Sequence, residues 1–146
     1  MGMYTEFHFN VELSKTVPDF VINLLNFMIE GDFTKQKETL KKELEDRCVW
    51  ANLFNTDRWA TMLRTDSGYF GADTHSTLRF DETAHKYYLC VRCNVKNYDN
   101  EIGEFIDWIM PYVDKYNDEF LGFYRYEEDR EPTLIFKNEW PADKNS

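Results

Sequence analysis

The three histidines of this chain, His8, His75 and His85, are the side chains best suited to acid–base or metal chemistry. Their spacing gives no His-x-His or His-Glu-x-x-His pattern, and Asp73-x-His75 alone is a weak metal signal. Asp73, His75 and Ser76 have the residue types of a catalytic triad. Neighbouring residues of a strand point to opposite faces, so His75 and Ser76 would not meet as base and nucleophile. We therefore expect neither a metal site nor a triad here.

Cys90 and Cys93 have the C-x-x-C spacing of redox and zinc motifs. Residues 87–95 alternate in polarity as a strand does, and this alternation places the two thiols on opposite faces. The third cysteine, Cys48, is too few to complete a zinc site. We predict packed thiols without metal or cofactor, and free thiols favour a reducing, cytoplasmic compartment.

The sequence contains no phosphate loop, no dinucleotide glycine pattern and no Gly-x-Ser-x-Gly elbow. Four acidic residues fall within 127–131, which reads as a turn, and a solvated cluster explains them more simply than an acid–base pair does. These observations lean against an enzyme without excluding one. An enzyme with His8 or His75 as general base, oriented by a carboxylate in a cleft, stays an alternative.

Four donor or aromatic residues form the most suggestive constellation of the chain. They are His8, Arg79, Tyr88 and Arg92. If strands 5–13 and 87–95 are neighbours, all four share the face opposite the hydrophobic one, where they could hold a carboxylate, a phosphate or a peptide backbone. Open sheet faces with such residues also bind RNA bases. The ordinary alternative is that His8 and Arg92 only pair with Glu6, Glu12 or the insertion described below.

The 146 residues carry a formal net charge of −10, concentrated in the C-terminal third. Residues 99–131 contain 11 Asp or Glu against 3 Lys or Arg. A field of this sign repels phosphate backbones, so we expect no nucleic acid partner. It would attract a basic protein surface, although acidic surfaces also serve solubility alone. Without a long apolar run or a signal pattern, we expect no membrane association.

The elements that must position these residues begin with a strictly alternating strand at 5–13. Its predicted buried face consists of Phe7, Phe9, Val11 and Leu13. An amphipathic helix is predicted over Val17–Glu30, with Pro18 in its first turn and Gly31 ending it at positive φ. A second helix is predicted over Asp99–Tyr116, with a kink or break at Pro111.

Further strands are predicted at 74–80, 87–95, 121–127 and 133–137, with Leu134 and Phe136 inward in the last. A partly helical insertion occupies about 32–65, and a polar tail about 138–146. We expect one α+β domain over residues 1–146. Its order of strand, helix, insertion, strand, strand, helix, strand, strand resembles the ferredoxin-like split βαβ arrangement with one strand added. The resemblance implies a mainly antiparallel sheet with helices on one face, and we expect 5–13 and 87–95 to be parallel central neighbours.

We expect a small cytoplasmic protein of accessory or inhibitor kind that binds another protein without catalysis. The missing catalytic motifs, the acidic C-terminal third and the 17% aromatic residues motivate this hypothesis. The alternative is a small-molecule or anion sensor on the open sheet face, with His8 and Arg92 in one pocket. Homodimerisation through an edge strand or the Trp-bearing insertion is left open.

Overall fold

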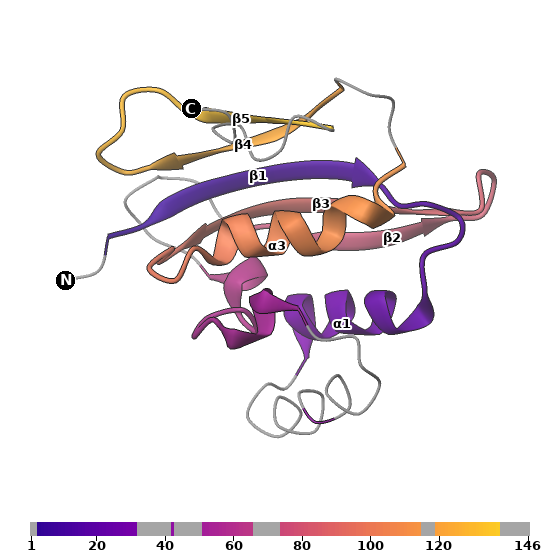
Figure 1. The fold of residues 1–146 in the computed structure, drawn as a ribbon. Coiled ribbons are helices and arrows are strands. Elements are labelled where there is room, and N and C mark those ends of the chain that lie inside the picture. Colours follow the sequence, from indigo (N-terminus) through magenta and orange to yellow (C-terminus); the bar gives the residue numbers. More distant parts are fainter. Residues whose placement is uncertain (1–2, 32–41, 43–50, 66–73, 115–118, 138–146) are drawn as a thin grey trace.

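The computed structural model describes residues 3–31, 42, 51–65, 74–114 and 119–137. These residues form an α+β domain with one five-stranded antiparallel sheet and two α-helices (Figure 1). In chain order the elements are β1 (Thr5–Glu12), α1 (Asp19–Glu30), β2 (Thr77–Asp81), β3 (Lys86–Val95), α3 (Glu101–Ile109), β4 (Phe120–Tyr126) and β5 (Thr133–Phe136). The strands lie in the order β2-β3-β1-β4-β5.

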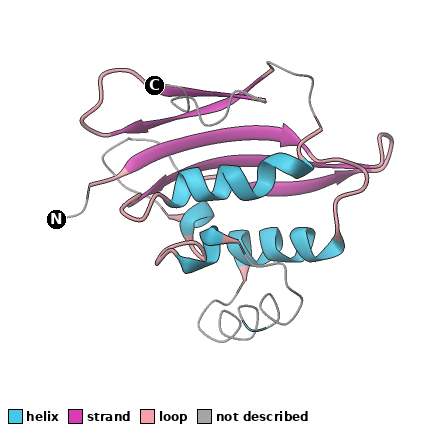
Figure 2. Ribbon diagram, viewed as in Figure 1, coloured by secondary structure: helices cyan, strands magenta, loops and turns pink. Residues whose placement is uncertain are grey.

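The central strand β1 has the one-sided burial that its alternation predicts. Its inward residues Phe7 and Phe9 are fully buried, and their rings meet Phe105 of α3 at centroid distances of 6.0 and 6.1 Å. Burying one such ring stabilises the fold by about 2–3 kcal/mol. Both helices pack on this side of the sheet, as Figure 2 shows, so the opposite face carries no α-helix among the described residues.

The expected parallel pairing of 5–13 with 87–95 is wrong. β1 and β3 are central neighbours, but they run antiparallel, with Thr5 opposite Val95. The reason lies in the path of the chain. It leaves α1 for the edge strand β2, which runs parallel to β1, and the short turn at 82–85 then reverses it into β3. His85 in this turn has a φ of 55°, a value suited to a tight reversal.

Both helices are shorter than their sequence patterns predict. α1 begins at Asp19, and its C-terminal Gly31 has a φ of −74° in place of the expected positive value, with its N–H donating to the Phe27 carbonyl at 2.8 Å. α3 ends at Ile109 and continues as a 3-10 turn, η4 (Met110–Tyr112). The expected break at Pro111 is thus confirmed, because proline cannot donate the next helical hydrogen bond. Residues 115–118 lie outside the described residues.

The described part of the insertion packs against α1 and α3 as two 3-10 turns, η1 (Asn52–Asn55) and η2 (Met62–Arg64). Between them lies Trp59, which is fully buried, with its ring 4.9 Å from Phe54 and 6.0 Å from Phe27. This part of the insertion therefore adds buried aromatic side chains to the core beside α1. Residues 32–41 and 43–50 of the insertion, and the predicted tail at 138–146, lie outside the described residues.

The C-terminal hairpin differs from the prediction in the face that it buries. Ile135 is fully buried, whereas Leu134 is 44% exposed, so the expectation that Leu134 and Phe136 point inward is wrong. Ile135 pairs with Gly122, next to a register shift between Phe120 and Gly122, and alternation then turns its neighbours outward. Gly122 has a φ of 158°, and a Cβ there would lie 1.9 Å from the His8 carbonyl oxygen, so β1 and β4 approach closely at this residue.

Candidate functional site

A row of four side chains crosses the sheet face that lies opposite α1 and α3. The pairing register places Arg92 of β3 beside His8 of β1, His8 beside Phe123 of β4, and Phe123 beside Leu134 of β5. We call these four side chains the central row. It spans about 14 Å at the usual spacing between strands. One end of it is cationic and the other is apolar.

His8 occupies the middle of the central row. Its ring stacks on Phe123 with centroids 4.6 Å apart and an interplanar angle of 13°, and its Nε2 lies 3.5 Å from the Glu6 carboxylate. Partial burial, followed by the Arg92 charge, lowers the pKa of His8 below its ordinary value, although Glu6 opposes this shift. Near pH 7 the imidazole is therefore mainly neutral, and it serves as a flat, hydrogen-bonding surface.

The acidic residues of the open face contact cations other than Arg92. Glu6 accepts a hydrogen bond from Arg125 Nε at 2.9 Å, and Glu12 lies 3.6 Å from Lys86 Nζ. Within the described part of the chain no carboxylate pairs with the Arg92 guanidinium, which is exposed. The alternative that His8 and Arg92 pair with Glu6, Glu12 or the insertion therefore holds for His8, through Glu6, but not for Arg92 among the described residues.

The four predicted site residues lie on one face as two separate pairs. His8 and Arg92 are cross-strand partners, and so are Arg79 and Tyr88, whose ring lies 5.2 Å from the Arg79 guanidinium carbon. Tyr88 and Arg92 are four residues apart on β3, a distance of about 13 Å along a strand. A small anion can therefore contact only one pair, whereas contact with both needs an extended surface.

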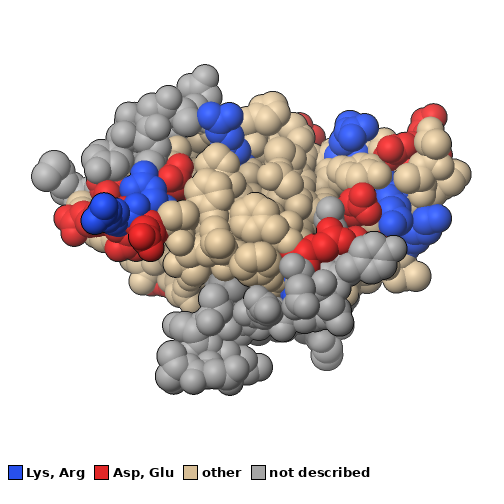
Figure 3. Space-filling view, turned by 90° about the horizontal axis from the view of Figure 1, so that it is seen from above, with Lys and Arg blue, Asp and Glu red and all other residues tan. Residues whose placement is uncertain are grey.

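The apolar end of the open face is a feature that the sequence patterns did not reveal. Phe120 is 54% and Leu134 is 44% exposed, and the Phe120 ring lies 5.7 Å from that of Phe136. Together with Phe123 these side chains form what we call the apolar end: Phe120, Phe123, Leu134 and Phe136. Viewed from above, where β4 and β5 lie uppermost, the molecule has an uncharged middle with charged residues gathered toward its two ends (Figure 3).

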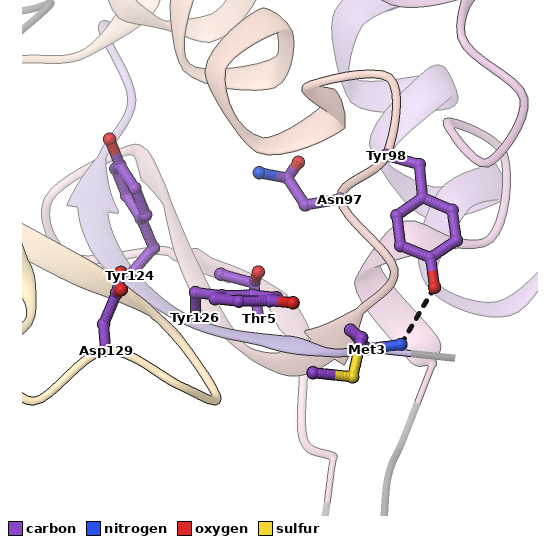
Figure 4. A pocket seen from close by; sticks show the side chains of 7 residues that line it. All are labelled: Met3, Thr5, Asn97, Tyr98, Tyr124, Tyr126 and Asp129. Atoms are coloured by element: carbon purple, nitrogen blue, oxygen red, sulfur yellow. Dashed lines mark hydrogen bonds between the residues drawn. The ribbon is translucent and has the colours of Figure 1, made fainter. Parts of the chain in front are cut away.

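A pocket of about 200 Å³ lies on the other side of the sheet, beside the loop that enters α3 (Figure 4). Its lining consists of Met3, Thr5, Asn97, Tyr98, Tyr124, Tyr126 and Asp129. The sensor hypothesis expects His8 and Arg92 in one pocket, but this pocket contains neither residue. Tyr124 and Tyr126 alternate along β4, which is a visible signal, yet the sequence does not reveal that the loop before α3 lies beside them.

The described residues show no arrangement typical of metal or thiol chemistry. Among them, no three His, Cys, Asp or Glu side chains lie close enough together to hold a metal ion. Cys93 is buried, and burial raises the pKa of its thiol well above the ordinary value, which makes it unreactive. Neither α1 nor α3, the α-helices of the described ranges, has the length and apolar character needed to cross a bilayer.

The chain matches no known family model, no curated protein and no solved structure. The geometry of the open face and of the pocket is therefore the basis for assigning a function.

Proposed function

We propose that this protein binds another protein through the open face of its sheet and catalyses no reaction. The observation that carries this proposal is the central row with its apolar end, which joins exposed Phe120 and Leu134 to His8 and Arg92. Exposed large apolar side chains that gather on one face mark interaction surfaces. Aromatic and arginine side chains are also the residues that most often anchor such interfaces.

The chemistry of the surface defines the partner. The apolar end would pack against apolar side chains of the partner, and the exposed Arg92 would bind a partner carboxylate beside them. The acidic turn at 127–131, at the tip of the β4–β5 hairpin, would face basic partner residues, as the charge of −10 suggests. The partner is therefore a protein that combines an apolar patch with both acidic and basic residues.

We also infer that the architecture is a split βαβ arrangement with β5 added beside β4. This inference is supported by the chain order β1, α1, β2, β3, α3, β4 together with the strand order β2-β3-β1-β4. The arrangement explains why one face lacks α-helices, since both crossover helices pack on the same side. It says nothing by itself about what the open face binds.

A matched pair of surface variants tests the proposed interface. Leu134→Ser and Phe120→Ser together remove the two most exposed side chains of the apolar end. Phe80→Ser is the control, because Phe80 is 43% exposed but lies on β2, at the opposite edge of the sheet. All three positions are at the surface, so each variant should keep its melting temperature. The tagged wild type and both variants are used for affinity capture from the source cell, with quantitative mass spectrometry.

The proposal predicts a protein that is captured by the wild type and by Phe80→Ser but is lost in the double variant. Arg92→Gln alone should also weaken binding of this partner to the otherwise wild-type protein, and added salt should weaken the wild-type complex. Equal capture by all variants, or no specific capture at low and moderate salt, would overturn the proposal. Sedimentation of the purified wild type and double variant shows whether the captured partner is a second copy of this chain.

The juxtaposition of His8 and Arg92 favours a second candidate, an anion sensor. These cross-strand neighbours offer one carboxylate or phosphate an imidazole and a guanidinium that pairs with no carboxylate among the described residues. The sensor hypothesis predicts that small carboxylates or inorganic phosphate raise the melting temperature of the wild type but not of Arg92→Gln. Arg79→Gln is the control, because Arg79 lies about 13 Å away along the sheet. No stabilisation by any such anion would remove this candidate.

A further inference from the structure

The pocket beside the loop that enters α3 has an unusual lining for its size. Three of its seven lining residues are tyrosines, one is an acid, and none is basic. Its volume of about 200 Å³ equals that of about seven water molecules, well below the range of drug-sized ligand sites. A small headgroup fits this space, whereas a nucleotide or a larger metabolite does not.

The three tyrosines come from two separate parts of the chain. Tyr124 and Tyr126 extend from β4 toward the side of Phe7 and Thr5, their cross-strand partners on β1. Tyr98 belongs to the loop before α3, and its hydroxyl accepts a hydrogen bond from the Met3 backbone N–H at 2.9 Å, which fixes the ring across the pocket from β4 (Figure 4). The pocket is therefore walled by aromatic rings on two sides.

The charged residue of the pocket lining is the acidic Asp129, whose backbone carbonyl accepts a hydrogen bond from Arg125 Nη1 at 3.0 Å. Burial and the nearby Glu128, Glu127 and Asp129 carboxylates raise the pKa of Tyr126 above its ordinary value. Within the described ranges, no hydrogen bond or ion pair engages the Asp129 carboxylate. Tyr98 already holds a cation on its ring, since the Arg58 guanidinium carbon lies 5.0 Å from the ring centroid.

We propose that this pocket binds a methylated ammonium group, held against the faces of Tyr98, Tyr124 and Tyr126 and neutralised by Asp129. Aromatic faces attract such cations through their quadrupole. The shared chemistry is the quaternary ammonium head, which either a free choline-type molecule or a trimethylated lysine of a protein can supply. The site is distinct from the open face and does not depend on the function proposed above.

A comparison of two isosteric probes tests the proposal directly. Choline and its uncharged tert-butyl analogue have the same shape, so they differ in charge alone. Choline should bind with a dissociation constant on the order of 1 mM, measured from amide shifts in NMR spectra. The neutral analogue should bind at least about tenfold more weakly. Titration with trimethyl-lysine and unmodified lysine peptides shows which source the pocket prefers.

Variants of the pocket separate aromatic from structural effects. Tyr126→Leu should weaken choline binding by about tenfold, whereas Tyr126→Phe, which keeps the ring, should change it by less than about threefold. Asp129→Asn should weaken binding by a few-fold, and Tyr112→Leu, which lies outside the pocket, should leave it unchanged. Equal binding of choline and its neutral analogue, or no amide shift with any cationic probe, would overturn the proposal. Leu134→Ser should not affect choline binding, so this proposal and that of the protein interface fail independently.

Discussion

The buried Glu101 carboxylate, in the first turn of α3, accepts a hydrogen bond from the Arg58 backbone N–H at 3.2 Å and lies 3.5 Å from the Arg58 guanidinium. Its second oxygen accepts from the Asp99 N–H at 3.0 Å, and Asp99 accepts from the Asp57 N–H at 2.9 Å. These contacts join the described part of the insertion to the start of α3.

Glu101→Gln should lower the free energy of unfolding by about 1–3 kcal/mol, because it removes the charge from a buried site with several donors. Urea denaturation measures this change. Glu104→Gln is the matched control, since Glu104 lies in the same helical turn but is partly exposed, and it should cost no more than about 0.5 kcal/mol. Similar losses for the two variants would show that the effect comes from the helix terminus and not from the contact with Arg58.

Gly122→Ala should prevent folding or destabilise the protein by more than about 3 kcal/mol. The added Cβ would lie 1.9 Å from the His8 carbonyl oxygen, which is backbone and cannot move without disrupting the pairing of β1 with β4. Gly103→Ala is the control, because the atoms nearest to its Cβ, at 2.5 to 2.8 Å, belong to the Asn100 side chain, which can move aside more easily than backbone, and alanine also favours a helix. Circular dichroism melting distinguishes the two, and a Gly122→Ala protein as stable as the wild type would contradict the close approach of the strands.

The two cysteines of β3 should differ in reactivity under native conditions. Cys90 is partly exposed on the open face, whereas Cys93 is buried and has a raised pKa. Iodoacetamide labelling, resolved by peptide mass spectrometry, should modify Cys90 first and leave Cys93 protected until the protein is unfolded. Simultaneous modification of both in the native protein would contradict the placement of the thiols on opposite faces.

His8 should make the protein less stable as the pH falls from about 7 to about 5. Its pKa in the folded state lies below the unfolded value, so between the two values the unfolded state binds more protons and is favoured. His8→Gln should flatten this part of the stability profile, measured by urea denaturation at several pH values. An unchanged profile in His8→Gln would contradict this assignment.

The alternation of apolar and polar residues predicts which segments are strands with one buried face. The alternation at 5–13 predicts both the strand β1 and its buried face, because a half-buried strand must repeat every two residues. The same parity places His8, Tyr88 and Arg92 on the opposite face. The parallel direction assigned to β1 and β3 fails because direction depends on the path of the chain between them, through the edge strand β2.

The remaining features depend on contacts between distant residues. Residues 133–136 contain three apolar side chains, so their pattern does not decide whether Leu134 or Ile135 points inward, and the pairing with Gly122 decides it. The apolar end of the open face follows from that choice. The tyrosine pocket likewise forms because Tyr98 lies beside β4. The residues around Tyr98 in the sequence do not predict this contact.

The central position of β1 has a consequence for synthesis on the ribosome. Thr5 pairs with Val95 on one side and with Tyr126 on the other, so both partner strands of β1 come later in the chain. At about 5–20 residues per second, the nascent strand, with Phe7 and Phe9 uncovered, waits on the order of 5–15 s for its first neighbour. During that interval it is a segment that a ribosome-associated chaperone would hold, and a transcript cut short before β4 would leave one edge of β1 open to aggregation.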